Sequence, residues 1–112
     1  MKDINKYIIE KQKTFVLSDD ERNSLIELVG IATEQCGEDS DIKEYEEFRK
    51  DCQENEINTL IDLYDLLNDK HTYPKINNRL IQNNELYLLI KLINYALDKD
   101  IIDLSEILEK IQ

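Results

Sequence analysis

The side chains of this sequence that could do chemistry are one histidine, two cysteines and 25 carboxylates. The histidine, His71, has no cysteine or serine near it in a recognisable nucleophile context, so a nucleophile and base pair is not indicated. Carboxylates on helices can hold two iron ions, but that site requires a Glu-x-x-His motif on each of two helices. A single histidine cannot supply both motifs. We therefore predict that the protein has no catalytic residues and is not an enzyme.

Metal and cofactor motifs are also missing from the sequence. Cys36 and Cys52 do not form a Cys-x-x-Cys pair, so a zinc framework is not indicated. Asp98, Asp100 and Glu109 match three positions of a calcium loop, but an aspartate stands where that loop requires glycine. With only 2 glycines, the chain has no glycine-rich phosphate loop. We expect no metal and no cofactor, and two reduced cysteines that pack as small apolar groups in a cytoplasmic protein.

The elements that must position these side chains are expected to be helices. Apolar residues recur at helical spacing, and the 112 residues contain only 2 Gly and 1 Pro. No apolar run is long enough for a signal peptide or a membrane span. The length fits one domain, so we predict an all-α, bundle-like domain over residues 1–112 with five or six helices. Helices are expected at about 3–14, 18–36, 41–69, from Pro74 to about 82, at 85–98 and at 101–111.

Local signals define some of these helices more closely than others. Ser18 and Glu21 have the spacing of a capping box at a helix start. Gly37 stands where a glycine commonly ends a helix, and Gly30 inside the same helix indicates a close contact with a neighbouring helix. The helix at 85–98 is apolar nearly all round, which is typical of a buried central helix.

The segment 41–69 is open to two interpretations. Ser40 and Asp41 can cap its start, and no Gly or Pro interrupts it. Its apolar residues stay within one broad helical face, so one long amphipathic helix is expected. Two helices that meet near residues 54–56 are an equal alternative. Two tyrosines of this segment, Tyr45 and Tyr64, are expected in the core.

The negative charge of the chain is concentrated in one part of the sequence. The formal net charge is −11, and residues 18–69 carry 17 acids but only four Lys and Arg. The flanking segments 1–17 and 70–112 have formal charges of about +2 and 0, which leaves −13 for the middle. On a continuous helix, six acids of 41–69 fall in one stripe opposite the apolar face. These predicted partner-binding residues are Glu44, Glu47, Asp51, Glu54, Asp62 and Asp65.

The acidic stripe has two interpretations. Like charges three or four residues apart destabilise a helix slightly, and few lysines are interspersed to relieve them. The stripe can therefore be a surface that attracts a basic partner, or it can be an ordinary solvated face. Direct nucleic-acid binding is disfavoured because phosphate contacts need clusters of Lys and Arg.

These features predict a non-enzymatic, acidic protein-binding module. Small acidic helical proteins without catalytic residues are often immunity proteins, antitoxins or phage-encoded inhibitors of host or defence proteins, which is an analogy of class and not of residues. The expected partner is a basic protein, a toxin or a nucleic-acid-handling enzyme, whose basic surface the acids block in place of phosphates. The alternative is a helical regulatory or scaffold module that binds through apolar helix faces. The module is expected to be a monomer or homodimer that binds neither nucleic acid directly nor a membrane.

Overall fold

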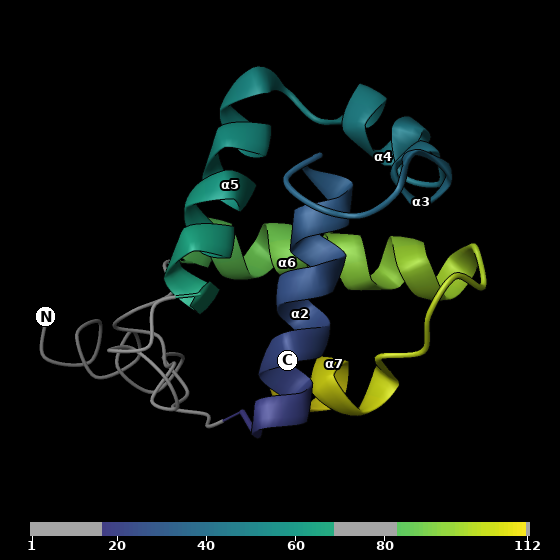
Figure 1. Ribbon diagram of the computed structural model, residues 1–112. Coiled ribbons are helices and arrows are strands. Elements are labelled where there is room, and N and C mark those ends of the chain that lie inside the picture. Colours follow the sequence, from purple (N-terminus) through teal and green to yellow (C-terminus); the bar gives the residue numbers. More distant parts are fainter. Residues whose placement is uncertain (1–16, 69–82, 112) are drawn as a thin grey trace, which may run out of the picture.

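Six helices form the part of the chain that a computed structural model describes, residues 17–68 and 83–111 (Figure 1). They are α2 (Asp19–Ala32), α3 (Asp39–Lys43), α4 (Glu46–Asp51), α5 (Glu54–Asn68), α6 (Asn83–Asp98) and α7 (Ser105–Ile111). These described residues contain no strand, and the all-α prediction is confirmed. The helices predicted at 3–14 and from Pro74, and the loop with His71, lie outside the described residues.

Helix α2 begins with the predicted capping box. The Ser18 hydroxyl accepts a hydrogen bond from the Glu21 amide at 3.2 Å, and the Glu21 carboxylate accepts one from the Ser18 amide at 2.9 Å. Two of the orphan amides at the helix start are thereby satisfied. The same carboxylate lies 2.7 Å from Lys110 Nζ, so the start of α2 is also tied to α7.

Helix α2 ends at Ala32, four residues earlier than predicted. Glu34 adopts the left-handed conformation with φ 64°, and the Gln35 amide donates to the Gly30 carbonyl at 2.7 Å. This is the Schellman arrangement that ends many helices, with a glutamate in the place usually taken by glycine. Gly37, which also has a positive φ of 96°, therefore lies in the following loop and does not end the helix.

The prediction of one long helix over 41–69 is wrong, because the chain leaves the helical path at Glu44 and Tyr45, between α3 and α4. Arg49 donates a hydrogen bond at 2.8 Å to the Ile42 carbonyl at the end of α3. That carbonyl also accepts a hydrogen bond from the Tyr45 amide at 3.2 Å. The bond spans three residues instead of the four of a regular α-helix, so the turn is tighter.

The second break lies close to the position expected for two helices. Cys52 is extended, and the Gln53 amide donates to the Glu56 carboxylate at 2.9 Å, which caps the start of α5. The expected cap at Ser40 is also wrong, because α3 has Glu38 as its N-cap and includes Ser40.

Aromatic contacts hold α3 and α4 against the end of α6. The ring centroids of Tyr45 and Phe48 lie 5.9 Å and 5.6 Å from the centroid of Tyr95, within the range of favourable aromatic pairs. The Tyr95 hydroxyl donates to the Glu44 carbonyl at 2.9 Å. We call residues 39–51 the α3–α4 corner, and these contacts together with Arg49 hold it in place.

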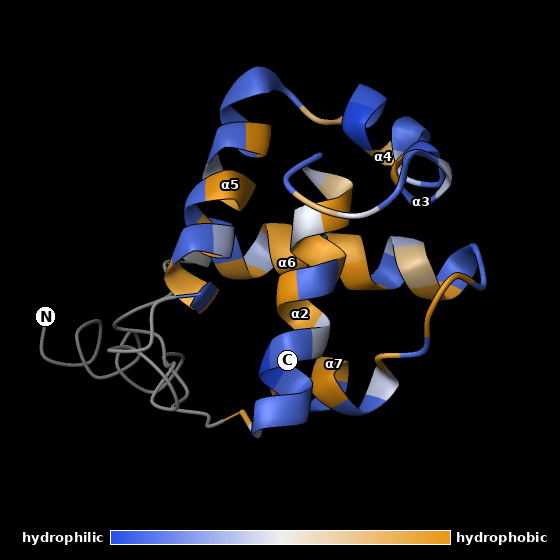
Figure 2. Ribbon diagram, in the orientation of Figure 1, coloured by the Kyte–Doolittle hydropathy of each residue, from blue (hydrophilic) through white to orange (hydrophobic). Residues whose placement is uncertain are grey.

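Helix α6 contributes one side to the core, so its prediction as a helix buried nearly all round is only partly confirmed; Tyr87 on the opposite side is 64% exposed. The helix crosses α2 in Figure 1 and packs against α5 and α7, while α2 packs against α5. Figure 2 shows hydrophobic residues concentrated on α6 and hydrophilic ones on the α3–α4 corner. The side chains of α6 that are buried are Leu88, Leu89, Leu92, Ile93 and Ala96.

Gly30 makes the close helix contact that the sequence predicts. A Cβ atom at this position would lie 2.8 Å from the ring of Tyr64 and would also overlap Cys36 Sγ. The absence of a side chain therefore lets α2 approach α5 at this point.

The last helix starts later than predicted. Asp100 adopts a left-handed φ of 59°, and the Ile101 amide donates to the Ala96 carbonyl at 2.9 Å, which ends α6. The chain then runs without helix to Ser105, whose amide donates to the Asp103 carboxylate at 3.0 Å. Residues 101–104 thus form a connection and not the first turn of α7, and this places Ile101 and Ile102 beside α2.

Candidate functional site

The six predicted partner-binding acids are all exposed, but they do not form one stripe. Glu44 lies between α3 and α4, Glu47 and Asp51 lie on α4, and the other three lie on α5. The helix is broken twice, so the six acids fall into two groups (Figure 1). We call the three on or just before α4 the α4 acids (Glu44, Glu47 and Asp51) and the three on α5 the α5 acids (Glu54, Asp62 and Asp65). The prediction of a single helical stripe is therefore wrong.

One of the α4 acids is already paired. Glu47 lies 3.0 Å from Lys99 Nζ, and this ammonium group also lies 5.8 Å from the centroid of the Tyr95 ring. The hydrogen bond and the charge of Glu47 raise the pKa of Lys99. The pair joins α4 to the end of α6, which gives Glu47 a structural role.

Two of the three basic residues of the α3–α4 corner, Arg49 and Lys50, are also engaged. Arg49 lies 3.6 Å from the Glu34 carboxylate and bonds backbone carbonyls, while Lys50 pairs with Glu46 at 3.4 Å. Among the residues of the two described ranges, the five predicted acids other than Glu47 have no ion-pair partner. Their charge is exposed and is not neutralised by an ion pair within the described part of the chain.

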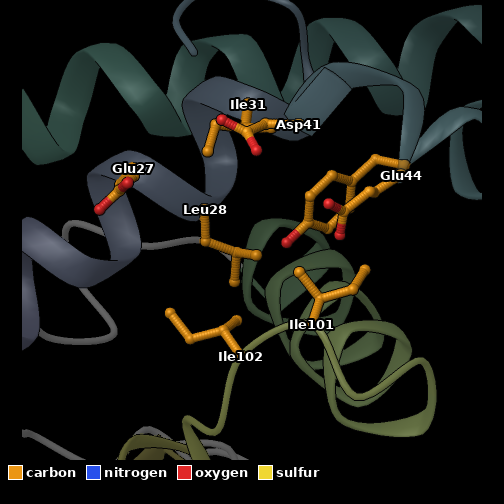
Figure 3. A pocket seen from close by; sticks show the side chains of 8 residues that line it. Glu27, Leu28, Ile31, Asp41, Glu44, Ile101 and Ile102 are labelled. Atoms are coloured by element: carbon orange, nitrogen blue, oxygen red, sulfur yellow. The ribbon is translucent and has the colours of Figure 1, made fainter. Parts of the chain in front are cut away.

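A small hollow lies where α2, the α3–α4 corner and the α6–α7 connection meet (Figure 3). Its volume is about 210 Å³. Four apolar side chains and three carboxylates line it, together with Tyr45, and no lysine or arginine does. We call this site the acidic hollow; it is lined by Glu27, Leu28, Ile31, Asp41, Glu44, Tyr45, Ile101 and Ile102.

Tyr45 is the most buried polar residue of the acidic hollow. Only 2% of its surface is exposed, and its hydroxyl makes no hydrogen bond with any residue of the described ranges. Burial raises the pKa of Tyr45 to about 12, and the negative charges of Glu44, Asp41 and Glu27 contribute to the rise. The hydroxyl therefore stays protonated at neutral pH in a negative environment.

The prediction from sequence found only part of this site. Glu44 was predicted as a binding residue, and Tyr45 was predicted as a core residue, which is confirmed. The contributions of Glu27, Asp41 and Ile102 were missed. No local signal joins these residues, because they come from three elements that meet only in the folded protein.

The two cysteines are free and half-buried. Cys36 was expected on the helix, but it lies in the loop after α2. Burial raises the pKa of the Cys52 thiol, which disfavours the reactive thiolate. Both thiols therefore pack as small apolar groups at the edge of the core.

The comparisons with known proteins add no functional information. No protein family model matches the chain, and no curated protein or solved structure matches it either. Among the described helices, none combines the length and apolarity needed to cross a membrane. The described side chains also include no group of three or more His, Cys, Asp and Glu placed to hold a metal ion.

Proposed function

We propose that this protein is a non-enzymatic binding module that holds a basic partner protein through its exposed acids. In this proposal it acts as a stoichiometric inhibitor, of the immunity, antitoxin or phage-encoded type, and blocks a basic surface of a toxin or nucleic-acid-handling enzyme. Exposed acids in the place of phosphates would compete with nucleic acid for such a surface.

The unbalanced charge of residues 38–68 carries this proposal. This segment has 11 Asp and Glu against Lys43, Arg49 and Lys50. Arg49, whose side chain is 18% exposed, is directed to backbone carbonyls, and Lys50 pairs with its neighbour Glu46. A field of one sign raises the rate of association with a surface of the opposite sign and disfavours acidic partners.

Affinity capture from the native host lysate at low and high salt tests the proposal. The wild-type protein should retain a basic protein in low salt and release it in high salt. Asp51→Lys on α4 and Asp65→Lys on α5 each reverse one exposed charge, and at least one of them should weaken the capture. Glu109→Lys on α7 makes the same change of charge elsewhere and should not. Capture that survives high salt and both reversals would show that the acids are not the interface.

The alternative, a module that binds through apolar faces, depends on two side chains. Tyr87 and Ile102 are the exposed large hydrophobic residues of the described chain, with exposed fractions of 64% and 36%. They lie on different elements, α6 and the α6–α7 connection, so they do not make one helix face. Light scattering separates the two functions, because a dimer that persists in high salt favours the alternative and a monomer favours the inhibitor.

A further inference from the structure

We infer that the acidic hollow receives one basic side chain of the partner protein, with its cationic group at Glu27, Asp41 and Glu44 and its aliphatic stem against the apolar wall. The inference rests on the proposed function and specifies one contact of that interface. It concerns a hollow that lies mostly outside the six acids predicted from the sequence.

The size of the acidic hollow suits a single side chain. Its volume of about 210 Å³ lies below the roughly 300–1,000 Å³ of ordinary cofactor and ligand pockets. A lysine or arginine side chain is long and narrow, with an apolar stem and a charged end. A nucleotide or a large cofactor would not fit in this volume.

The apolar wall matches the stem of such a side chain. Leu28 and Ile31 come from α2, while Ile101 and Ile102 come from the connection before α7. Figure 3 shows Leu28, Ile101 and Ile102 on one side of the hollow and Asp41 and Glu44 on the other. Ile102 is 36% exposed, so an aliphatic stem placed beside it would remove apolar surface from water.

The three carboxylates supply the charge that a basic group needs. They come from α2, α3 and the link between α3 and α4, and no lysine or arginine lines the hollow to balance them. A basic group placed between these carboxylates would be attracted by their negative charge. Among the described residues, these three carboxylates do not form a group that could hold a metal ion. A larger organic cation therefore fits better than a metal.

The Tyr45 hydroxyl is the independent observation that indicates a ligand. Only 2% of the surface of Tyr45 is exposed, and this residue lines the hollow. Its hydroxyl has no hydrogen-bond partner among the described residues. The oxygen itself is open to the hollow, because it is not among the enclosed side-chain atoms of the described residues that lack a partner. An ammonium or guanidinium group in the hollow would donate to this oxygen and satisfy it.

The test is an NMR titration of the whole protein with a blocked lysine, Nα-acetyl-lysine-methylamide. Its matched control ligand is the norleucine analogue, which has a similar stem but no charge. A ligand of this size should bind with a Kd of about 1–10 mM. We expect the lysine ligand to shift resonances of Leu28, Ile101 and Ile102, and the norleucine ligand to leave them unchanged. The arginine analogue shows whether a guanidinium group is accepted as well.

Variants of the acidic hollow test the role of each group. Removing two charges with Glu27→Gln and Asp41→Asn should weaken lysine binding about tenfold. Tyr45→Phe keeps the ring and removes the hydroxyl, so it should weaken binding about threefold. The double variant Glu106→Gln with Glu109→Gln makes the same change of charge on α7, away from the hollow, and should bind like the wild type. Amide spectra establish that each variant is folded.

Three outcomes would overturn the inference: no shift with lysine, equal shifts with norleucine, or unchanged binding in the variant that lacks Glu27 and Asp41. The proposed function fails separately. If the captured partner is held by the exposed acids but lysine does not bind the hollow, only the inference is wrong. If lysine binds but no basic partner is captured, only the proposed function is wrong.

Discussion

The α3–α4 corner and helix α5 share a pattern of apolar and acidic residues but have different structures. Both alternate apolar residues at helical spacing with exposed acids, yet residues 54–68 form one helix and residues 39–51 form two short ones. In α5 the buried residues are Leu60, Leu63 and Leu67, which all lie on one side of a regular helix. In the corner the buried residues are Tyr45 and Phe48, which both pack on Tyr95 of α6.

The difference lies in where the backbone hydrogen bonds go. Inside α5 the helix satisfies its own amides and carbonyls. In the corner, the Ile42 carbonyl is satisfied by the Arg49 guanidinium and the Glu44 carbonyl by the Tyr95 hydroxyl. Contacts with distant residues therefore decide the path of the corner, whereas periodicity decides the path of α5. The corner also carries Asp41, Glu44 and Tyr45 of the acidic hollow, so its tertiary contacts build the candidate site.

Arg49→Met tests this comparison with the largest expected effect. The variant keeps the aliphatic stem but removes the donors to Ile42 at 2.8 Å and Ala32 at 3.5 Å. Hydrogen bonds made by charged groups contribute about 1.5–3 kcal/mol, so the free energy of unfolding should fall by about 2 kcal/mol. Hydrogen exchange should speed up in residues 39–51 before it does in α5.

Lys50→Met is the matched control for Arg49→Met. Lys50 is exposed and pairs with Glu46 within one helix, so its removal should cost less than about 0.5 kcal/mol. If Arg49→Met leaves exchange in residues 39–51 unchanged, or lowers protection equally in α5, the guanidinium does not hold the corner.

Gly30→Ala tests the regular part of the molecule, where α2 meets α5. The new methyl group would lie 2.8 Å from the Tyr64 ring, and such overpacking costs about 1–3 kcal/mol. Alanine raises helix propensity by about 1 kcal/mol, so we expect a net loss of about 1 kcal/mol in urea unfolding. Asn23→Ala on the exposed face of α2 should stabilise the protein by a few tenths of a kcal/mol. A Gly30→Ala protein more stable than the wild type would disprove the close contact.

The ion pair of Glu21 and Lys110 gives the smallest effect, which depends on pH. The hydrogen bond from Lys110, followed by that from the Ser18 amide, lowers the pKa of Glu21 from its usual value of 4.5. A carboxyl whose pKa is lowered by folding stabilises the protein above its unfolded-state pKa, and this contribution disappears as pH falls through the folded-state value. Glu21→Gln keeps the capping box but removes the charge.

We therefore expect Glu21→Gln to cost about 0.5 kcal/mol at neutral pH, because the pair lies at the surface. The difference between wild type and variant should shrink as the pH falls below the ordinary pKa of glutamate, as measured by thermal unfolding from neutral to acidic pH. A difference that stays constant with pH would mean that the charge of Glu21 is not involved.

The sequence was a good guide wherever neighbouring residues decide the structure. The capping box of Ser18 and Glu21, the extent of α6 to Asp98 and the close contact at Gly30 were all predicted and are confirmed. Each of these depends on spacing within one helix or on a residue type at one position.

The sequence was a poor guide wherever distant residues meet. The break in the corner depends on Arg49 and on Tyr95, which is 51 residues from Glu44 along the chain. The end of α2 was misplaced because Glu34, rather than a glycine, takes the left-handed conformation. The end of α6 at Asp98 was predicted correctly, but α7 starts at Ser105 and not at residue 101. The acidic hollow could not be predicted because its acids and its isoleucines share no local pattern.

In the proposed function, the exposed acids of α4 and α5 hold a basic partner. The most direct measurement is the Kd of the purified partner, determined by calorimetry at low and physiological salt, for the wild type and for Asp51→Lys, Asp65→Lys and Glu109→Lys. We expect an affinity that falls as salt rises and a clear loss in Asp51→Lys or Asp65→Lys, while Glu109→Lys binds like the wild type. A Kd that is the same at both salt concentrations and in all three variants would contradict the proposed function.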